Sequence, residues 1–186
     1  MRASATDRTS VGADRTEPKR DLPLVIVDAS NVAFGGSRGS RKARLDLLLD
    51  VVSQVPRAGC ELKVVADASL RHRIDKREEY EGFVRDGFFL QAPAGRSADQ
   101  FIVLLVNKRQ AEGQQVRVLT NDLLREHPDL ESMRITFLEI SEGEVVFDPP
   151  LGSLNPRRTQ TESATDGELG VTSVAPALEE GFLGWR

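Results

Sequence analysis

The sequence of 186 residues is poor in cysteine and in aromatic residues, and it has no long apolar run. Its only cysteine, Cys60, cannot form a disulfide within the chain, which favours a reducing cytoplasm. The apolar runs 22–27 and 101–106 are far shorter than the roughly 20 residues of a membrane-spanning helix. Residues 1–21 lack the apolar core of a secretory signal. The sequence therefore predicts a cytoplasmic protein with no membrane association.

An excess of basic residues is also absent. The formal net charge is −4, and the sequence pI is about 5.3. This balance argues against a globally basic nucleic-acid-binding protein, although it leaves room for a local basic patch.

Composition divides the chain into three segments. Residues 1–21 and 151–186 are rich in Ser, Thr, Pro, Gly and charge and have no apolar periodicity, so we expect a disordered N-terminal arm and a mostly disordered C-terminal tail. Residues 22–150 are long enough to form one domain. The tail ends with the only tryptophan, Trp185, beside Phe182 and Leu183. Docking of this end onto another protein and its folding back onto the domain both remain open.

Within the domain, strand and helix patterns alternate. The predicted strands are 22–28, 61–67, 88–92, 116–120, 134–140 and 144–148, and the predicted helices are 45–55, 75–87, 97–113 and 121–127. Leu45, Leu48, Leu49 and Val52 predict the apolar stripe of the first helix. Asp75 with Glu78, and Ser97 with Gln100, have the spacing of capping boxes. The alternation predicts an α/β fold whose mostly parallel sheet has helices on both faces.

Acidic residues follow the predicted strands with unusual regularity. Asp28 ends the first strand, Asp67 ends the second, Asp99 begins the helix after the third, and Asp122 follows the fourth. The carboxyl ends of parallel strands share one edge of a sheet, which is where ligands bind in such folds. Glu126, four residues after Asp122, would share a helix face with it at about 6 Å between Cβ atoms.

Carboxylates gathered at one edge repel each other unless a proton or a cation intervenes. Oxygen ligands without Cys or His favour Mg²⁺ or Mn²⁺ over zinc, and such ions serve phosphodiester hydrolysis. Each acid also has a structural explanation, such as a turn or a helix cap. Asp67 is the least secure member, because the segment after it could turn it away to pair with Arg71 or Arg73.

Three segments in order, VIVDASNVAF (25–34), ADQFIV (98–103) and LTNDLLREH (119–127), resemble the NYN branch of the PIN-like nucleases. The similarity is greatest to the Regnase-type ribonuclease domain and spans residues 22–148. It implies a Rossmann-like PIN fold and Mg²⁺-dependent cleavage of single-stranded RNA, most simply by an endonuclease.

The resemblance assigns roles to five residues of this chain. Asp28, Asp99 and Asp122 match the acids of the metal site, and Asn31 matches an asparagine that orders it. Glu126 falls where eukaryotic Regnase-type domains have another acid, and we expect it to orient a water. The sequence departs from this pattern in two ways. Ala98 stands where those domains have a second adjacent acid, and a single cysteine cannot form their CCCH zinc finger.

Two basic groups lie next to the acids in the sequence. Arg38, Arg41, Lys42 and Arg44 follow the first strand within a Gly-rich segment, and Arg71 and Arg73, with Lys76 and Arg77, follow Asp67. Arginine can make forked contacts with phosphate oxygens, so we expect these groups to bind RNA on either side of the acids. Phe34 could stack on a base or belong to the core.

Two functions from different classes fit these residues. The first is a metal-dependent ribonuclease. The second is a catalytically weak or inactive PIN-fold module that binds RNA or a protein, which the loss of an acid at Ala98 would favour. Phosphoester hydrolysis on DNA or nucleotides is a third interpretation, and a homodimer remains open.

Overall fold

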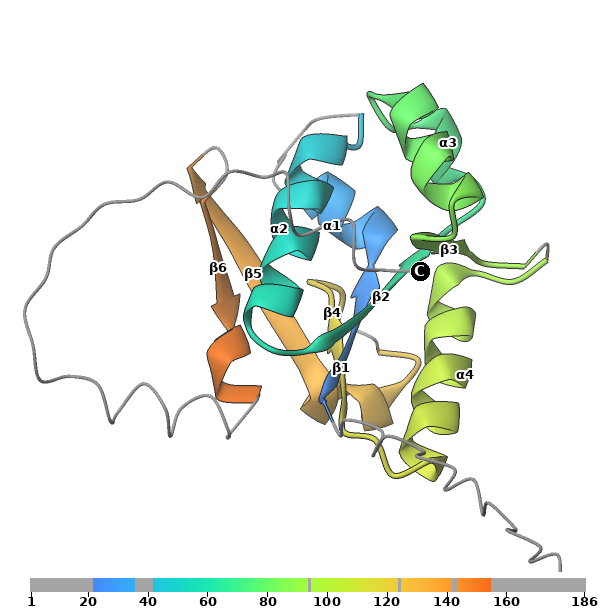
Figure 1. Ribbon diagram of the computed structural model, residues 1–186. Helices are drawn as coiled ribbons and strands as arrows, with labels where there is room; N and C mark the ends of the chain where they lie inside the picture. The colour runs from blue at the N-terminus through green and yellow to red at the C-terminus, as the bar shows by residue number, and fades with distance from the viewer. Residues whose placement is uncertain (1–21, 36–41, 94, 124, 142–143, 155–186) are drawn as a thin grey trace, which may run out of the picture.

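The chain forms a six-stranded, mostly parallel sheet with helices on both faces (Figure 1). The computed structural model describes residues 22–35, 42–93, 95–123, 125–141 and 144–154. The strands are β1 (Leu24–Asp28), β2 (Glu61–Ala66), β3 (Phe89–Gln91), β4 (Val116–Leu119), β5 (Arg134–Ser141) and β6 (Glu144–Asp148). The helices are α1 (Ala29–Gly35), α2 (Leu45–Arg57), α3 (Arg77–Arg85) and α4 (Ala98–Ala111), with 3₁₀ turns η1 (Leu70–His72), η2 (Pro128–Met133) and η3 (Leu151–Leu154). The predicted α/β class is confirmed.

The strand order is β3-β2-β1-β4-β5-β6. All neighbouring pairs from β3 to β5 are parallel, and only β6 runs antiparallel to β5. The chain builds the sheet in one direction from β1 to β3 and then returns to add β4 on the other side of β1. The gap between the ends of β1 and β4 is therefore the topological switch point, where ligands bind in open parallel sheets.

Two apolar layers hold the sheet between helices. The larger core cluster lies on the face covered by α1 and α2, and the smaller one lies on the opposite face beneath α4. Figure 1 shows these helices on the two sides of the sheet. All five residues of β1 are buried, as its run of apolar residues predicts. None of the helices in the described part of the chain is long and apolar enough to cross a bilayer.

Several predicted helices differ from the observed ones. Helix α1 was not predicted, because its residues show no apolar stripe of the usual length. In α2 the buried face is wider than predicted and includes Leu47, Val51 and Val55, whereas Leu49 is only partly buried. The helix predicted at 97–113 forms as α4, of which only Ala98, Ile102 and Val106 are buried.

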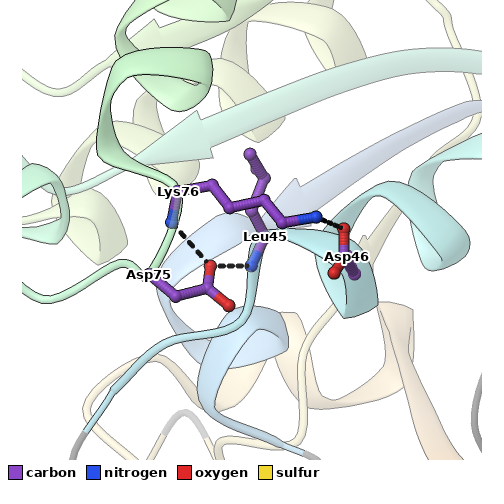
Figure 2. Close-up of polar contacts among 4 residues, drawn as sticks. All are labelled: Leu45, Asp46, Asp75 and Lys76. Atoms are coloured by element: carbon purple, nitrogen blue, oxygen red, sulfur yellow. Dashed lines mark hydrogen bonds and ion pairs between the residues drawn. The ribbon is translucent and has the colours of Figure 1, made fainter.

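In the capping box predicted at the start of α4, the hydrogen bond made by the Ser97 side chain is confirmed. The Ser97 hydroxyl accepts the Gln100 N–H at 3.2 Å at the start of α4. The other predicted box was wrong, because Asp75 does not close a box with Glu78 on α3. Its Oδ1 instead accepts the N–H of Leu45, the first residue of α2, at 2.9 Å, and the N–H of Lys76 at 2.8 Å (Figure 2).

The predicted helix at 121–127 does not form. Its described residues adopt bends and turns, and the next helical segment is η2, which begins at Pro128. Proline at the first position of a helix is favoured, while the residue before it is driven out of the helical region, so the proline starts η2 and cannot extend a helix from the N-terminal side. Asp122 and Glu126 therefore do not share a helix face.

The domain extends slightly beyond the predicted boundary at residue 150. Leu151 and Leu154 of η3 are buried in the larger core cluster. The predicted disordered arm, residues 1–21, and residues 155–186 of the predicted tail lie outside the described residues.

Candidate functional site

The acidic residues meet at the edge of the sheet formed by the carboxyl ends of the parallel strands. Asp28 is the last residue of β1, and Asp67 directly follows β2. Asp99 lies in the first turn of α4, and Asp122 follows β4. Because β1 and β4 are neighbours at the switch point, Asp28 and Asp122 come from the two sides of the expected ligand crevice.

Asp28 is the most deeply buried of these acids, with 5% of its surface exposed. One carboxylate oxygen accepts the N–H of Asn31 at 3.1 Å, and the other accepts the hydroxyl of Thr120 at 3.2 Å. The pKa of Asp28 is raised to about 6, first by burial and then by the charges of Asp99 and Asp67, against the lowering effect of these two hydrogen bonds. The carboxylate is thus partly protonated near neutral pH unless a cation is present.

Asp99 lies in the same electrostatic environment. Its pKa is raised first by partial burial, and then by the negative charges of Asp122, Asp67 and Glu126, while His127 acts in the opposite direction. Charge effects of this kind require proximity. The carboxylates predicted from separate segments of the chain therefore influence one another at one edge.

In the described part of the chain, Asp28 and the two partly buried acids near it are not paired with basic side chains. Within the described residues, Asp28, Asp67 and Asp99 form no ion pair with Lys or Arg, in contrast to the four ion pairs found elsewhere on the domain. The predicted alternative of Asp67 pairing with Arg71 or Arg73 does not occur.

Asp28 also has the structural role that the sequence left open. Its bond to Asn31 N–H closes the first turn of α1, as a helix cap does. A cap needs only an acceptor oxygen at the surface, and capping alone gives no reason to bury a carboxylate next to two others. Helix capping therefore explains the hydrogen bond of Asp28 to Asn31 but not the burial of its carboxylate.

The segment after β4 is held in place by amide side chains. The Asn31 side-chain oxygen accepts the N–H of Asn121 at 2.7 Å. Asn121 in turn pairs with the backbone of Phe137 in β5, donating to its carbonyl and accepting from its N–H, both at 2.9 Å. The Thr120 hydroxyl accepts the N–H of Asp122 at 3.1 Å. These bonds fix the direction in which the chain leaves β4, and so the position of Asp122.

Ala98, where the resemblance expects a second acid, faces the core. Only 2% of its surface is exposed, and it belongs to the apolar cluster beneath α4. The Ala98 backbone nevertheless lies next to the acids, because its N–H donates to Asp67 Oδ1 at 2.9 Å.

The donor set at this edge consists of oxygen atoms. Among the described residues, no three His, Cys, Asp or Glu side chains form a ready-made group that could hold a metal ion. Mg²⁺ does not require one, because it usually retains several waters and binds through one or two carboxylates together with substrate phosphates. The residues fit a hydrated Mg²⁺ or Mn²⁺ better than a fully protein-ligated ion.

The predicted basic residues have different surroundings. Arg38 and Arg41 lie outside the described residues. Lys42 is exposed, whereas the Arg44 guanidinium forms a two-pronged ion pair with Glu139, at 2.8 and 2.9 Å. The Arg44 guanidinium thus already has a carboxylate partner.

The basic residues of the second group, which follows Asp67, also have interaction partners within the domain. Arg73 is exposed and its guanidinium lies 4.3 Å from the centre of the Phe34 ring, a cation–π contact. Arg71 is exposed and donates to His72 at 3.1 Å. Lys76 and Arg77 pair with Asp46 and Glu81 on the helix surfaces, as Figure 2 shows for Lys76.

Sequence reasoning assigned no role to Ser30, Thr120 or Asn121, and it underrated Asp67. Thr120 has no exposed surface and contacts Asp28. A polar residue at the end of an otherwise apolar strand was the available signal for Thr120, since buried polar groups need partners. Nothing local distinguishes Ser30 or Asn121, because their partners lie far away in the sequence.

A comparison of the sequence with protein-family models found no match, and neither did a comparison with curated proteins.

Proposed function

We propose that the protein is a Mg²⁺-dependent ribonuclease that hydrolyses phosphodiester bonds of single-stranded RNA. The observation that carries the proposal is the burial of Asp28 beside Asp67 and Asp99 without a basic partner in the described part of the chain. Such an arrangement is unfavourable by itself and becomes favourable when a divalent cation binds. The choice of RNA rests on the resemblance to NYN domains.

In this proposal Asp28, Asp99 and Asp122 hold the ion, largely through its waters. When bound, the ion supplies an acidified water and positive charge near the scissile phosphate. Asn31 and Thr120 keep Asp122 next to Asp28, because Asn31 bonds to Asn121 and Thr120 bonds to both Asp28 and Asp122. Glu126 orients a water, a role for which its influence on Asp99 gives some support.

The basic residues with accessible side chains would bind the RNA backbone. Lys42, Arg71 and Arg73 are exposed among the described residues. Arg38 and Arg41 are proposed on their sequence position alone. Arg44 is a weaker candidate, because an RNA phosphate would have to compete with Glu139 for its guanidinium.

Cleavage of a labelled single-stranded RNA tests the proposal. The wild-type protein should give products in Mg²⁺ or Mn²⁺ and none in EDTA, and Asp28→Asn should reduce the rate by at least about 10²-fold, since removal of one group that stabilises a transition state typically has such an effect. Asp129→Asn, at an exposed acid outside the site, is the control and should retain activity. Equal cleavage by Asp28→Asn would indicate a contaminant.

Metal binding can be measured without RNA. Mn²⁺ should bind the wild-type protein, as detected by electron paramagnetic resonance, and should raise its melting temperature. Both effects should be strongly reduced in Asp28→Asn. Binding without any cleavage of RNA would instead favour the second function, a PIN-fold module that has lost turnover. Cleavage of matched DNA or nucleotide substrates in preference to RNA would favour the third interpretation, phosphoester hydrolysis on DNA or nucleotides.

A further inference from the structure

Asp67 makes hydrogen bonds that join three parts of the sheet edge. Its Oδ1 accepts the N–H of Ala98, the first residue of α4, at 2.9 Å. Its Oδ2 and its own N–H both contact the hydroxyl of Ser30 in the first turn of α1, each at 3.4 Å. One residue at the end of β2 is thus bonded to the helix that follows Asp28 and to the helix that carries Asp99.

These contacts are distinct from ordinary capping of α4. The N-terminus of that helix already has a local cap, because the Ser97 hydroxyl accepts the N–H of Gln100. Asp67 uses a different N–H and reaches it from 31 residues away in the sequence. A long-range acceptor adds little local helix propensity, but it determines where the first turn of α4 lies relative to β2.

The position of Asp99 depends directly on that turn. Asp99 is the residue after Ala98, so the bond to Ala98 N–H restrains the backbone from which its carboxylate projects. On the other side, Asp28 precedes α1, whose first turn contains Ser30. Asp67 therefore lies between the two elements that deliver Asp28 and Asp99 to the edge.

We infer that Asp67 is a positioning residue. By bonding to the Ala98 N–H and to the Ser30 hydroxyl at the same time, it fixes the position of Asp99 relative to Asp28. The inference rests on the proposed function, because the distance between Asp28 and Asp99 matters only if both act on one ion. It assigns a role beyond the three acids proposed to hold the metal.

The chain offers a matched set of variants. Asp67→Ala removes the acceptor, Asp67→Asn keeps an oxygen in the same place, and Ser97→Ala removes the local cap from the same helix terminus. Asp67→Ala should reduce kcat for RNA cleavage by at least about tenfold with little change in KM, because small misplacements of reacting groups have large effects on rate. Asp67→Asn should recover kcat to within about threefold of wild type, and Ser97→Ala should remain within the same range.

Three outcomes would overturn the inference: wild-type kcat in Asp67→Ala, an equal loss in Ser97→Ala, and no recovery in Asp67→Asn. The second outcome would indicate a general need for a stable α4.

Failure of the proposed function gives a different result, because then the wild-type protein itself shows no metal-dependent cleavage. Hydrogen exchange decides the positioning role in that case. Faster exchange of the Ala98 and Asp99 amides in Asp67→Ala than in Ser97→Ala would support it, and unchanged exchange would overturn it.

Discussion

A single carboxylate, that of Asp28, both closes the first turn of α1 and lies buried among other acids. The two hydrogen bonds it accepts favour its charged form, yet burial has the larger effect and raises its pKa to about 6. The folded protein therefore binds the Asp28 proton more tightly than the unfolded chain does, whose ordinary value is 3.8. Stability contributed by this proton is lost as the pH rises through that interval.

Asp28→Asn should therefore stabilise the protein at high pH in the absence of metal. The pKa difference corresponds to a free energy of unfolding on the order of 3 kcal/mol, which the wild type loses as the pH rises from 3.8 to about 6 and the variant does not. Urea unfolding in EDTA at pH 8 should show a gain of up to this size, and at pH 4 the two proteins should have nearly equal stability. Asp129→Asn, at an exposed acid, should show neither effect. Equal stability of wild type and Asp28→Asn at pH 8 would mean that Asp28 is not appreciably desolvated.

At the scale of elements, the ends of helices are determined by residues from other elements. Arg44, at the N-cap position of α2, makes no side-chain cap hydrogen bond. Asp75, which lies between η1 and α3, accepts the first N–H of α2 instead (Figure 2). The same principle applies to α4, which receives Asp67 in addition to its own Ser97.

Asp75→Ala should destabilise the domain by about 1 kcal/mol, the usual effect of removing a helix cap. Glu78→Ala is the control, because the sequence pattern pairs Glu78 with Asp75 whereas the structure gives Glu78 no role in capping α2. Thermal unfolding of both variants measures the difference. A larger loss of stability in Glu78→Ala than in Asp75→Ala would instead support the capping box that the sequence suggests.

The packing of α1 on β5 depends on the absence of a side chain at Gly35. A Cβ atom at this position would lie 2.8 Å from Cε2 of Phe137 and even closer to Cζ, in a ring that is buried. Gly35→Ala should destabilise the domain by about 1–3 kcal/mol, as overpacking does, and chemical denaturation measures the change. Gly82→Ala on α3 is the control, since its nearest neighbour is an Arg85 nitrogen at 3.7 Å. A neutral Gly35→Ala would show that the Phe137 ring can move.

At the scale of the whole molecule, the core continues past the last strand. Leu151 and Leu154 are buried against the layer formed by α1 and α2. A chain ending at residue 150 should therefore be less stable than one ending at residue 154. Loss of a buried leucine side chain typically costs about 2–5 kcal/mol, and the deletion removes two. Melting temperatures of the two truncated proteins test this boundary. Equal melting temperatures would mean that the folded domain ends at residue 150.

The strand order brings distant parts of the chain to one place. Because β4 returns to the side of β1, the segment that contains Thr120, Asn121 and Asp122 meets Asp28 and Asn31, about 90 positions earlier. The acidic edge is thus a property of the topology and not of any single element.

Local sequence patterns were sufficient for the fold class, for the six strands and for the regular appearance of an acid after successive strands. Apolar periodicity and turn residues are properties of short segments, and they report burial that any compact arrangement must provide. For the same reason they failed at residues 121–127, where Pro128 and the bonds of Asn121 to β5 determine the backbone in place of the helical pattern.

The tertiary structure alone decided which polar groups meet. The sequence pattern could place Asp67 at a strand end, but it could not show that its partners are Ala98 and Ser30 and not a neighbouring arginine. Likewise, the burial of Asp28 and the inward direction of Ala98 arise only when β1 and α4 pack together. Hydrogen bonding and desolvation depend on distances between residues that are remote in the chain, and those distances exist only once the chain has folded.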